Sequence, residues 1–192
     1  TIYQHYGCKE EILATFVLRG GQRLIYIMDQ VLESQHSLRY KLSLFSACFL
    51  MNTRRQPEIT GIVAMVKSPE FQNKLSDRYQ AAITQIDNDV LMRILRLFTA
   101  DNSFDCGKAK QAAFGWWAMQ WGVQDILANG WELSRLGFDH PEASFFDSLH
   151  IFLNGLGVED DTESRDTDAL QGQAKQLLES SFEYIKTIRK TS

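Results

Sequence analysis

The chain has 192 residues, of which 44% are hydrophobic and 23% charged, with a formal net charge of −4 at pH 7. This balance is that of a soluble globular protein with a core, so it excludes a wholly disordered chain. No apolar run approaches the roughly 20 residues that cross a bilayer, and no secretion signal opens the chain, so we expect no membrane association. The acidic balance excludes DNA binding through a general positive field but leaves a local basic site open.

Residue patterns with a known chemistry are few. The three cysteines stand far apart, without a C-x-x-C pair, which is typical of reduced thiols in a cytoplasmic protein. The four histidines do not fall at metal-binding spacings, and neither a phosphate-binding glycine loop nor a G-x-S-x-G elbow occurs. We therefore expect no metal, no cofactor and no enzymatic activity.

The first predicted helix spans residues 9–33, where apolar side chains recur every three or four positions. Gly20 and Gly21 interrupt this pattern. Because a glycine inside a helix costs about 1 kcal/mol relative to alanine, we expect close packing or bending at this pair.

Three prolines, each followed by a glutamate, predict the starts of further helices. Proline at the first helical position lacks only an N–H that would have no partner, and a carboxylate in the first turn favours the positive end of the helix dipole. After a helix over residues 37–54, we expect a short helix over 57–67 and a long one over 69–97. The third proline begins a helix over 141–156.

The second half of the chain is also helical in pattern. We expect a loop over 101–107 and a helix over 108–136. Six of the ten residues 159–168 are acidic, which predicts a solvated linker or a mobile loop. An amphipathic helix over 167–190 could dock on the body or on a partner. Since no strand-like alternation appears, the chain is predicted to be an all-α protein of about seven helices.

The opening residues combine a turn with polar side chains. They indicate the end of a short helix, a turn at Gly7 and a new helix from Lys9, with Cys8 at the N-cap position and Glu11 as a capping-box acid. Hydroxyl, imidazole and ammonium donors beside a helix N-terminus suit a phosphate backbone.

The run Thr1-Ile2-Tyr3-Gln4-His5-Tyr6, followed by Lys9-Glu10-Glu11-Ile12, resembles the end of the helix-turn-helix in the Tet repressor family of bacterial transcriptional regulators. The resemblance covers about the first 13 of 192 residues. It implies that two preceding helices of the DNA-binding domain are absent from this chain. It also implies that Thr1 and Gln4 face the DNA groove, and that Tyr3, His5 and Lys9 contact phosphates. Cys8 departs from the polar residue usual there.

On this interpretation the chain has three parts. Residues 1–20 are the remnant of the DNA-binding domain and the start of the connecting helix. Residues 21–157 form a Tet-repressor-like helical bundle for ligand binding and dimerisation. Residues 158–192 are an acidic linker and the C-terminal amphipathic helix.

The helix over 108–136 carries three tryptophans within six positions, among small residues. One interpretation is packing in the core and between subunits. The other is a pocket for a small apolar or aromatic molecule, with Gln120 as an orienting polar group. The pocket would be lined by Phe45, Phe49, Tyr79, Ile83, Trp117, Gln120 and Trp121.

The helix over 141–156 carries more apolar surface than one core-facing stripe needs, which indicates a twin helix in a second copy. In the family that the chain resembles, the last two helices of each subunit form a four-helix dimer bundle. Two recognition helices would then stand roughly 34 to 36 Å apart. The residues predicted at this interface are Gly115, Ala118, Gly122, Phe145, Phe146, Leu149, Phe152 and Leu153.

The function expected from these features is ligand-controlled repression. A homodimer would bind operator DNA and be released by a small apolar or aromatic effector in the helical core, with Gly20 and Gly21 as a candidate hinge. The alternative is a helical dimerisation module that recruits protein partners and senses no small molecule.

Overall fold

The computed structural model describes residues 6–101, 104–128 and 133–191. These residues form eight α-helices and two short 3-10 helices, and none of them forms a strand. The prediction of an all-α chain is therefore confirmed for the described residues. The α-helices are α1 Lys9–Glu33, α2 Leu38–Arg55, α3 Pro57–Val66, α4 Pro69–Gln72, α5 Asp77–Thr99, α6 Cys106–Ala128, α7 Pro141–Leu156 and α8 Thr167–Thr191, and the 3-10 helices are η2 Leu133–Leu136 and η3 Thr162–Arg165.

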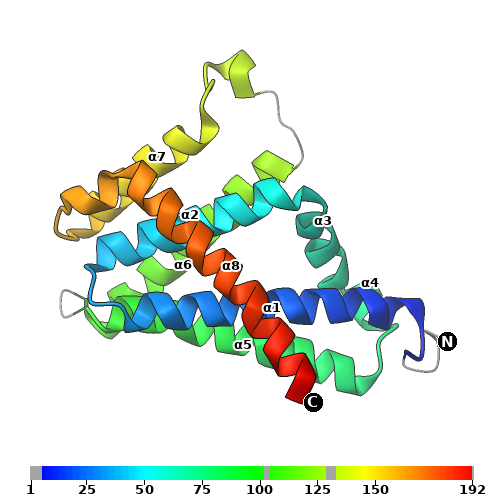
Figure 1. Ribbon diagram of the computed structural model, residues 1–192. Coiled ribbons are helices and arrows are strands. Elements are labelled where there is room, and N and C mark those ends of the chain that lie inside the picture. Colours follow the sequence, from blue (N-terminus) through cyan, green and yellow to red (C-terminus); the bar gives the residue numbers. More distant parts are fainter. Residues whose placement is uncertain (1–5, 102–103, 129–132, 192) are drawn as a thin grey trace.

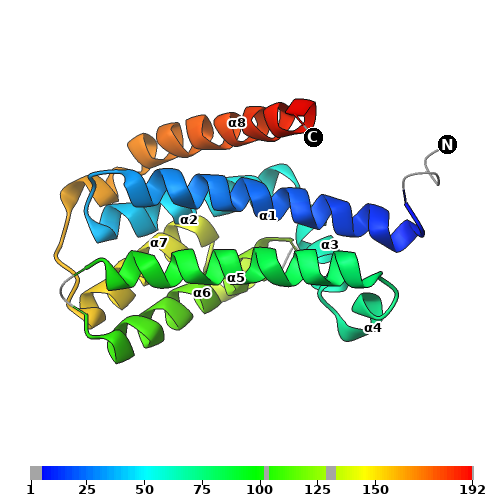
Figure 2. The ribbon, with the colours of Figure 1, turned by 90° about the horizontal axis from the view of Figure 1, so that it is seen from below.

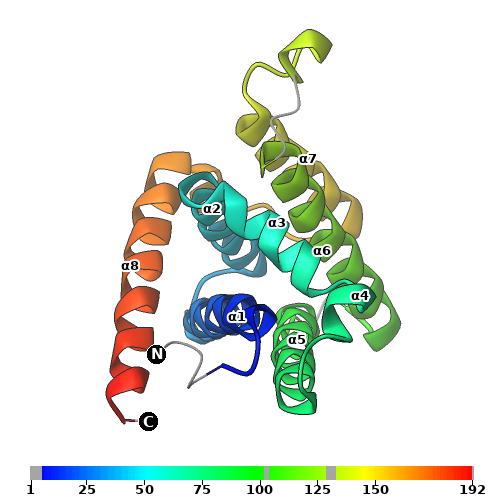
Figure 3. The same ribbon diagram turned by 90° about the vertical axis from the view of Figure 1, so that its right-hand side faces the viewer.

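The helices stack in layers (Figure 2). α8 forms an outer layer over α1 and α2, and α5 and α6 lie on the other side of those two helices. Figure 1 shows α8 crossing α2 and α1 at an angle, and Figure 3 shows α6 and α7 on the side of the body away from α8. The C-terminal helix therefore docks on the body, which decides between the two placements that its amphipathic pattern allowed.

The largest core cluster is built around α2. All residues from Leu42 to Leu50 are buried, because α2 is covered by α1, α6 and α8. Within this run, Ser46 donates to the carbonyl of Leu42 at 2.7 Å, and the Cys48 thiol donates to the carbonyl of Ala174 in α8 at 3.9 Å. Trp116 of α6 is fully buried beside Phe45, with ring centroids 5.2 Å apart.

The prediction of a single long helix over 69–97 is wrong, because the backbone leaves the helix after Gln72 and a new helix, α5, begins at Asp77. Gln80 bridges the break, since its side-chain amide donates to the carbonyls of Gln72 and Leu75, both at 3.0 Å. Phe71 and Leu75 remain buried in a second, smaller cluster against the start of α1. The apolar residues therefore keep a helical spacing across the break, which is why the sequence pattern predicted one helix.

The helix predicted over 108–136 also has different bounds. α6 begins at Cys106, two residues early, because the Asp105 carboxylate accepts the Lys108 backbone N–H at 2.8 Å. It extends to Ala128, and Leu133–Leu136 is a separate 3-10 helix.

The acidic segment 159–168 is mostly exposed, as expected for a solvated connection, but its first residues are anchored to the body. The guanidinium of Arg39, which is 0% exposed, donates to the carbonyls of Val158 at 2.6 Å and Glu159 at 2.8 Å. It also donates to the side chain of Asn154 at 2.7 Å. A buried cation on α2 therefore holds the connection between α7 and α8. Among the described helices, none is long and apolar enough to traverse a bilayer.

Candidate functional site

A cavity of about 710 Å³ lies between α1, α2, α3, α5, α6 and α8. This is within the size range that binds small molecules in proteins. Four residues predicted to bind a ligand line it, namely Phe45, Phe49, Trp117 and Trp121.

An aromatic cluster forms one wall of the cavity. Phe49 of α2 lies 5.7 Å from Trp117 and 6.4 Å from Trp121, measured between ring centroids. The two tryptophans meet edge to face at 6.0 Å. They are one helical turn apart on α6, so they share a face, whereas the adjacent Trp116 points into the core. The tryptophan run thus supplies two faces, as its spacing predicts.

Three of the predicted ligand-binding residues do not line this cavity. Tyr79 and Ile83 belong to the second cluster, and the hydroxyl of Tyr79 lies 3.3 Å from that of Thr15. Gln120 is fully buried and donates to Ser46 at 2.8 Å, so it orients a core hydroxyl instead of a ligand.

The α5 residues that do line the cavity are one to two turns further along the helix: Ile86, Asp87, Val90 and Leu91. Because the register of α5 against α1 depends on how the two helices pack, the apolar stripe alone could not select among these turns.

The sequence reasoning also missed the α8 wall. Leu178, Phe182 and Ile185 line the cavity from the C-terminal helix. Their amphipathic spacing was a usable signal, since it predicted a buried face, but it did not identify the surface that the face covers.

The main polar group on the α1 side of the cavity is Arg23. Its Nε donates to Ser181 at 3.2 Å, and its Nη2 donates to the side-chain oxygen of Asn52 at 3.3 Å. The guanidinium lies 3.3 Å from the ring centroid of Phe182. Burial, together with the charge of Arg55, lowers the pKa of Arg23 to about 10. Arg23 is therefore still a cation at neutral pH.

Two further groups at the cavity are already satisfied. Lys67 pairs with Asp87 at 2.7 Å, with its ammonium 5.7 Å from the ring centroid of Trp121. Burial raises the pKa of the Cys48 thiol to about 12, so this cavity-lining cysteine stays protonated at neutral pH. Neither group offers a free charge to a ligand.

The two glycines of α1 have different environments. Both lie within one unbroken helix and line the cavity. A Cβ at Gly21 would lie 2.3 Å from Cγ2 of Ile86, whereas a Cβ at Gly20 would meet nothing within 4 Å. Close packing of α1 on α5 therefore explains Gly21, and it does not explain Gly20.

Four of the five residues predicted to contact DNA are outside the part of the chain that the structure describes. Thr1, Tyr3, Gln4 and His5 lie outside the described residues. Lys9 is the exposed first residue of α1.

The capping box predicted at the start of α1 does not form as expected. The Glu11 carboxylate accepts the backbone N–H of Gly7 at 2.8 Å and the hydroxyl of Ser76 at 2.7 Å. Cys8 is the N-cap residue, but its side chain makes no cap bond to the helix. A thiol is a weak hydrogen-bond acceptor, which explains why Cys8 does not cap the helix. The Glu11 carboxylate instead joins the turn at Gly7 to Ser76, in the segment before α5.

The predicted dimer residues divide into two groups. Phe145, Leu149 and Leu153 are buried in the core of their own chain, which corrects their assignment to a partner interface. Phe146 and Phe152 are half-buried in the same chain, and Gly115 faces Phe152, whose ring would lie 3.1 Å from an added Cβ. Ala118 and Gly122 are exposed.

Two large apolar side chains beside these small residues are exposed, and the sequence reasoning missed both. Phe114 of α6 is 77% exposed and Ile151 of α7 is 72% exposed. Each is adjacent in sequence to a member of the Gly115–Phe152 contact, so they border the same helix pair. We name Phe114, Ala118, Gly122 and Ile151 the α6–α7 face.

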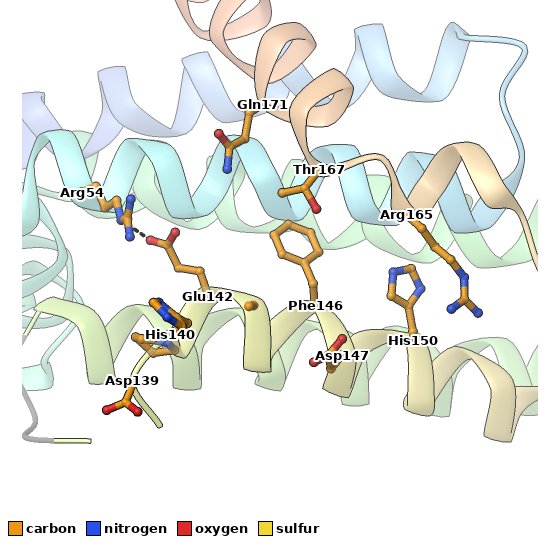
Figure 4. A pocket seen from close by; sticks show the side chains of 12 residues that line it. Arg54, Asp139, His140, Glu142, Phe146, Asp147, His150, Arg165, Thr167 and Gln171 are labelled. Carbon is orange, nitrogen blue, oxygen red and sulfur yellow. Dashed lines mark ion pairs between the residues drawn. The ribbon is translucent and has the colours of Figure 1, made fainter. Parts of the chain in front are cut away.

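A second hollow, of about 450 Å³, lies where α2, α7 and the start of α8 meet (Figure 4). Its cations already have acidic partners: Arg54 pairs with Glu142, and Arg165 pairs with Asp160 at 3.0 Å. Burial and the charge of Arg39 lower the pKa of His150, so its ring favours the neutral form. Within the described ranges, no three His, Cys, Asp or Glu side chains converge on a possible metal site.

The larger cavity is suited to bind an apolar or amphipathic molecule, because it combines aromatic faces, aliphatic walls and a cation. Comparisons of the chain with protein-family models, with curated proteins and with solved structures give no match.

Proposed function

We propose that this chain is the sensor and dimerisation body of a transcriptional regulator resembling the Tet repressor family, acting as a repressor without enzymatic activity. Its homodimer binds operator DNA and releases it when a small apolar or aromatic molecule enters the cavity. The observation that carries the proposal is the course of α1. This unbroken helix begins within the residues that resemble a DNA-reading motif, and it forms a wall of the cavity from Phe16 to Ile27.

A ligand in the cavity could displace the N-terminal end of α1 by tilting the helix. At 1.5 Å rise per residue, Lys9 lies about 18 Å along the helix axis from Gly21, where α1 packs closely against Ile86 of α5. A tilt of α1 at that contact would move its first turn further than the cavity wall itself. To shift the equilibrium between two spacings of the DNA readers, the ligand must favour one spacing by about 1 to 3 kcal/mol.

The α6–α7 face supports the homodimer. Phe114 and Ile151 are the two most exposed of the large apolar side chains that the structure describes, and apolar side chains gathered on one exposed face mark protein interfaces. The adjacent small residues Ala118 and Gly122 would let a second copy of the helix pair approach closely. Two copies joined at this face would hold two DNA readers at a fixed separation.

The direct test uses the native gene product and DNA from upstream of its own gene. A mobility-shift assay should show binding as a dimer, and compounds that raise its melting temperature should release the DNA. Filling the cavity with Val63→Trp should abolish the response to these compounds while DNA binding remains. Ala64→Trp, on the exposed side of the same helix, is the matched control.

The same assays separate the alternative function. A module that only recruits protein partners would dimerise through the α6–α7 face but would gain no thermal stability from any member of a broad library of apolar compounds. That silence, together with absence of DNA binding, would refute the proposed function.

A further inference from the structure

Arg23 differs from the other arginines that pack against the body. Arg93 is held by both carboxylate oxygens of Asp29, at 2.6 and 3.0 Å, and Arg165 and Arg54 each have an acidic partner. Among the described residues, no carboxylate lies within ion-pair distance of Arg23. Its neighbours are a hydroxyl, an amide and an aromatic ring.

The guanidinium also keeps unused donors. Arginine carries five N–H groups in a planar fork. Ser181 accepts the one on Nε and Asn52 accepts one on Nη2. No acceptor in the described part of the chain bonds to Nη1. A partly buried cation without a counter-charge is unfavourable, and an anion placed at the fork would relieve that cost through two parallel hydrogen bonds.

The charges at the cavity favour an anion at this end. Arg19, Arg23, Lys67 and Lys186 line the cavity against two carboxylates, Glu58 and Asp87, of which Asp87 is held by Lys67. Arg55 lies close enough to Arg23 for the two positive charges to repel each other. A bound anion at the junction of α1, α2 and α8 would be attracted by both. The aromatic cluster of Phe49, Trp117 and Trp121 forms an apolar wall of the same cavity.

We propose that the effector is an amphipathic acid, whose carboxylate binds the free edge of the Arg23 guanidinium and whose apolar body packs against the aromatic cluster. This inference rests on the proposed ligand-binding function and names the chemical class of the ligand. Phe182 stacks on the guanidinium and holds its plane, so that the fork can meet a carboxylate with both nitrogens.

The test compares two pairs of probes that share the apolar body and differ in the headgroup, an anionic carboxylate against a neutral hydroxymethyl: dodecanoate with dodecanol, and naphthoate with naphthalenemethanol. Dissociation constants are measured by calorimetry or native mass spectrometry on the full chain. We expect at least one acid to bind about tenfold or more tightly than its alcohol, since a hydrogen bond to a charged group contributes on this scale. Arg23→Gln should remove this preference, and Arg96→Gln, the same change at an exposed site outside the cavity, should keep it.

A second variant protects the test against misfolding of Arg23→Gln. Asn52→Asp places a carboxylate where the amide oxygen now lies, 3.3 Å from Arg23, and neutralises the guanidinium internally. It should leave binding of the alcohols intact and abolish the preference for the acids.

The outcomes separate the two proposals. If acids and alcohols bind equally, or if the acid preference survives both variants, the amphipathic acid is wrong while the cavity remains a ligand site. If acids, alcohols and every other apolar compound tested fail to bind, the sensor function fails as well.

Discussion

Replacing Gly21 by alanine should destabilise the fold, whereas the same change at Gly20 should not. The added Cβ at position 21 would lie 2.3 Å from Cγ2 of Ile86, about 1 Å inside ordinary contact. Because this methyl is attached at a branched Cβ, it cannot swing away as the end of a flexible side chain could. Overpacking of this kind costs about 1 to 3 kcal/mol, offset by up to about 1 kcal/mol of gained helix propensity.

At Gly20 only the gain remains, since nothing lies within 4 Å of an added Cβ. Gly20→Ala should therefore stabilise the chain by up to about 1 kcal/mol. The two variants should differ by roughly 1 to 3 kcal/mol, which is about 2 to 12 °C in melting temperature for a chain of this size. Thermal and urea unfolding, at one protein concentration, measure the difference.

A double-mutant cycle locates the cause. Ile86→Ala removes the clashing methyl, so Gly21→Ala should cost at least about 0.5 kcal/mol less in that background than in the natural chain. If Gly21→Ala is as stable as Gly20→Ala, or if its cost is unchanged by Ile86→Ala, then α1 and α5 do not approach as closely as described. The hinge hypothesis is better tested with Gly20→Ala alone, because a double change would mix hinge stiffening with this clash.

Three further outcomes concern a buried cation, a hydrogen-bonded carboxylate and an exposed apolar side chain. Arg39→Met should lower the free energy of unfolding by about 3 kcal/mol in urea titrations, because three acceptors lose a charged donor; an unchanged midpoint would contradict the anchoring of the acidic segment. The hydrogen bond from Ser76, followed by that from the backbone of Gly7, lowers the pKa of Glu11, so its contribution is present above the ordinary carboxyl value of 4.5 and is lost as pH falls through the lower folded pKa. Unfolding measured across this acidic range should therefore be less pH-dependent in Glu11→Gln, and an identical acid limb would refute the assignment. Ile151→Glu should convert a dimer to a monomer in light scattering, whereas Ala81→Glu on exposed α5 should not; a dimer in both would place the interface elsewhere.

The helices themselves were largely predictable because their signals are local. Prolines at first helical positions marked α3, α4 and α7, and the bounds predicted for α1, α7 and α8 agree with the structure to within a residue or two. The break between α4 and α5 was not predictable, since Phe71 and Leu75 keep the helical spacing while the backbone turns. What stabilises that turn is Gln80, whose amide reaches back to two carbonyls.

The candidate site was predictable only where one helix supplied both members of a pair. Phe45 with Phe49, and Trp117 with Trp121, share faces by spacing alone, and all four line the cavity. The placement of Tyr79 and Ile83 outside the cavity depended on the register between α1 and α5, in which Gly21 lies against Ile86. Burial of Phe145, Leu149 and Leu153 in their own chain followed from the placement of α7, which no local pattern encodes.

The position of Arg23 joins the two proposals into one mechanism. Arg23 belongs to α1, the helix proposed to carry the DNA reader, while Ser181 and Phe182 belong to α8 and Asn52 to α2. A carboxylate at the free edge of the guanidinium would add a further contact to these and pull on α1 itself. Coupling to α1 would need no series of intermediate side chains, because the headgroup of the ligand would bind directly to the helix that must tilt. An uncharged occupant of the same cavity could act on α1 only by packing, so under this mechanism acids release DNA more effectively than their alcohols at equal occupancy.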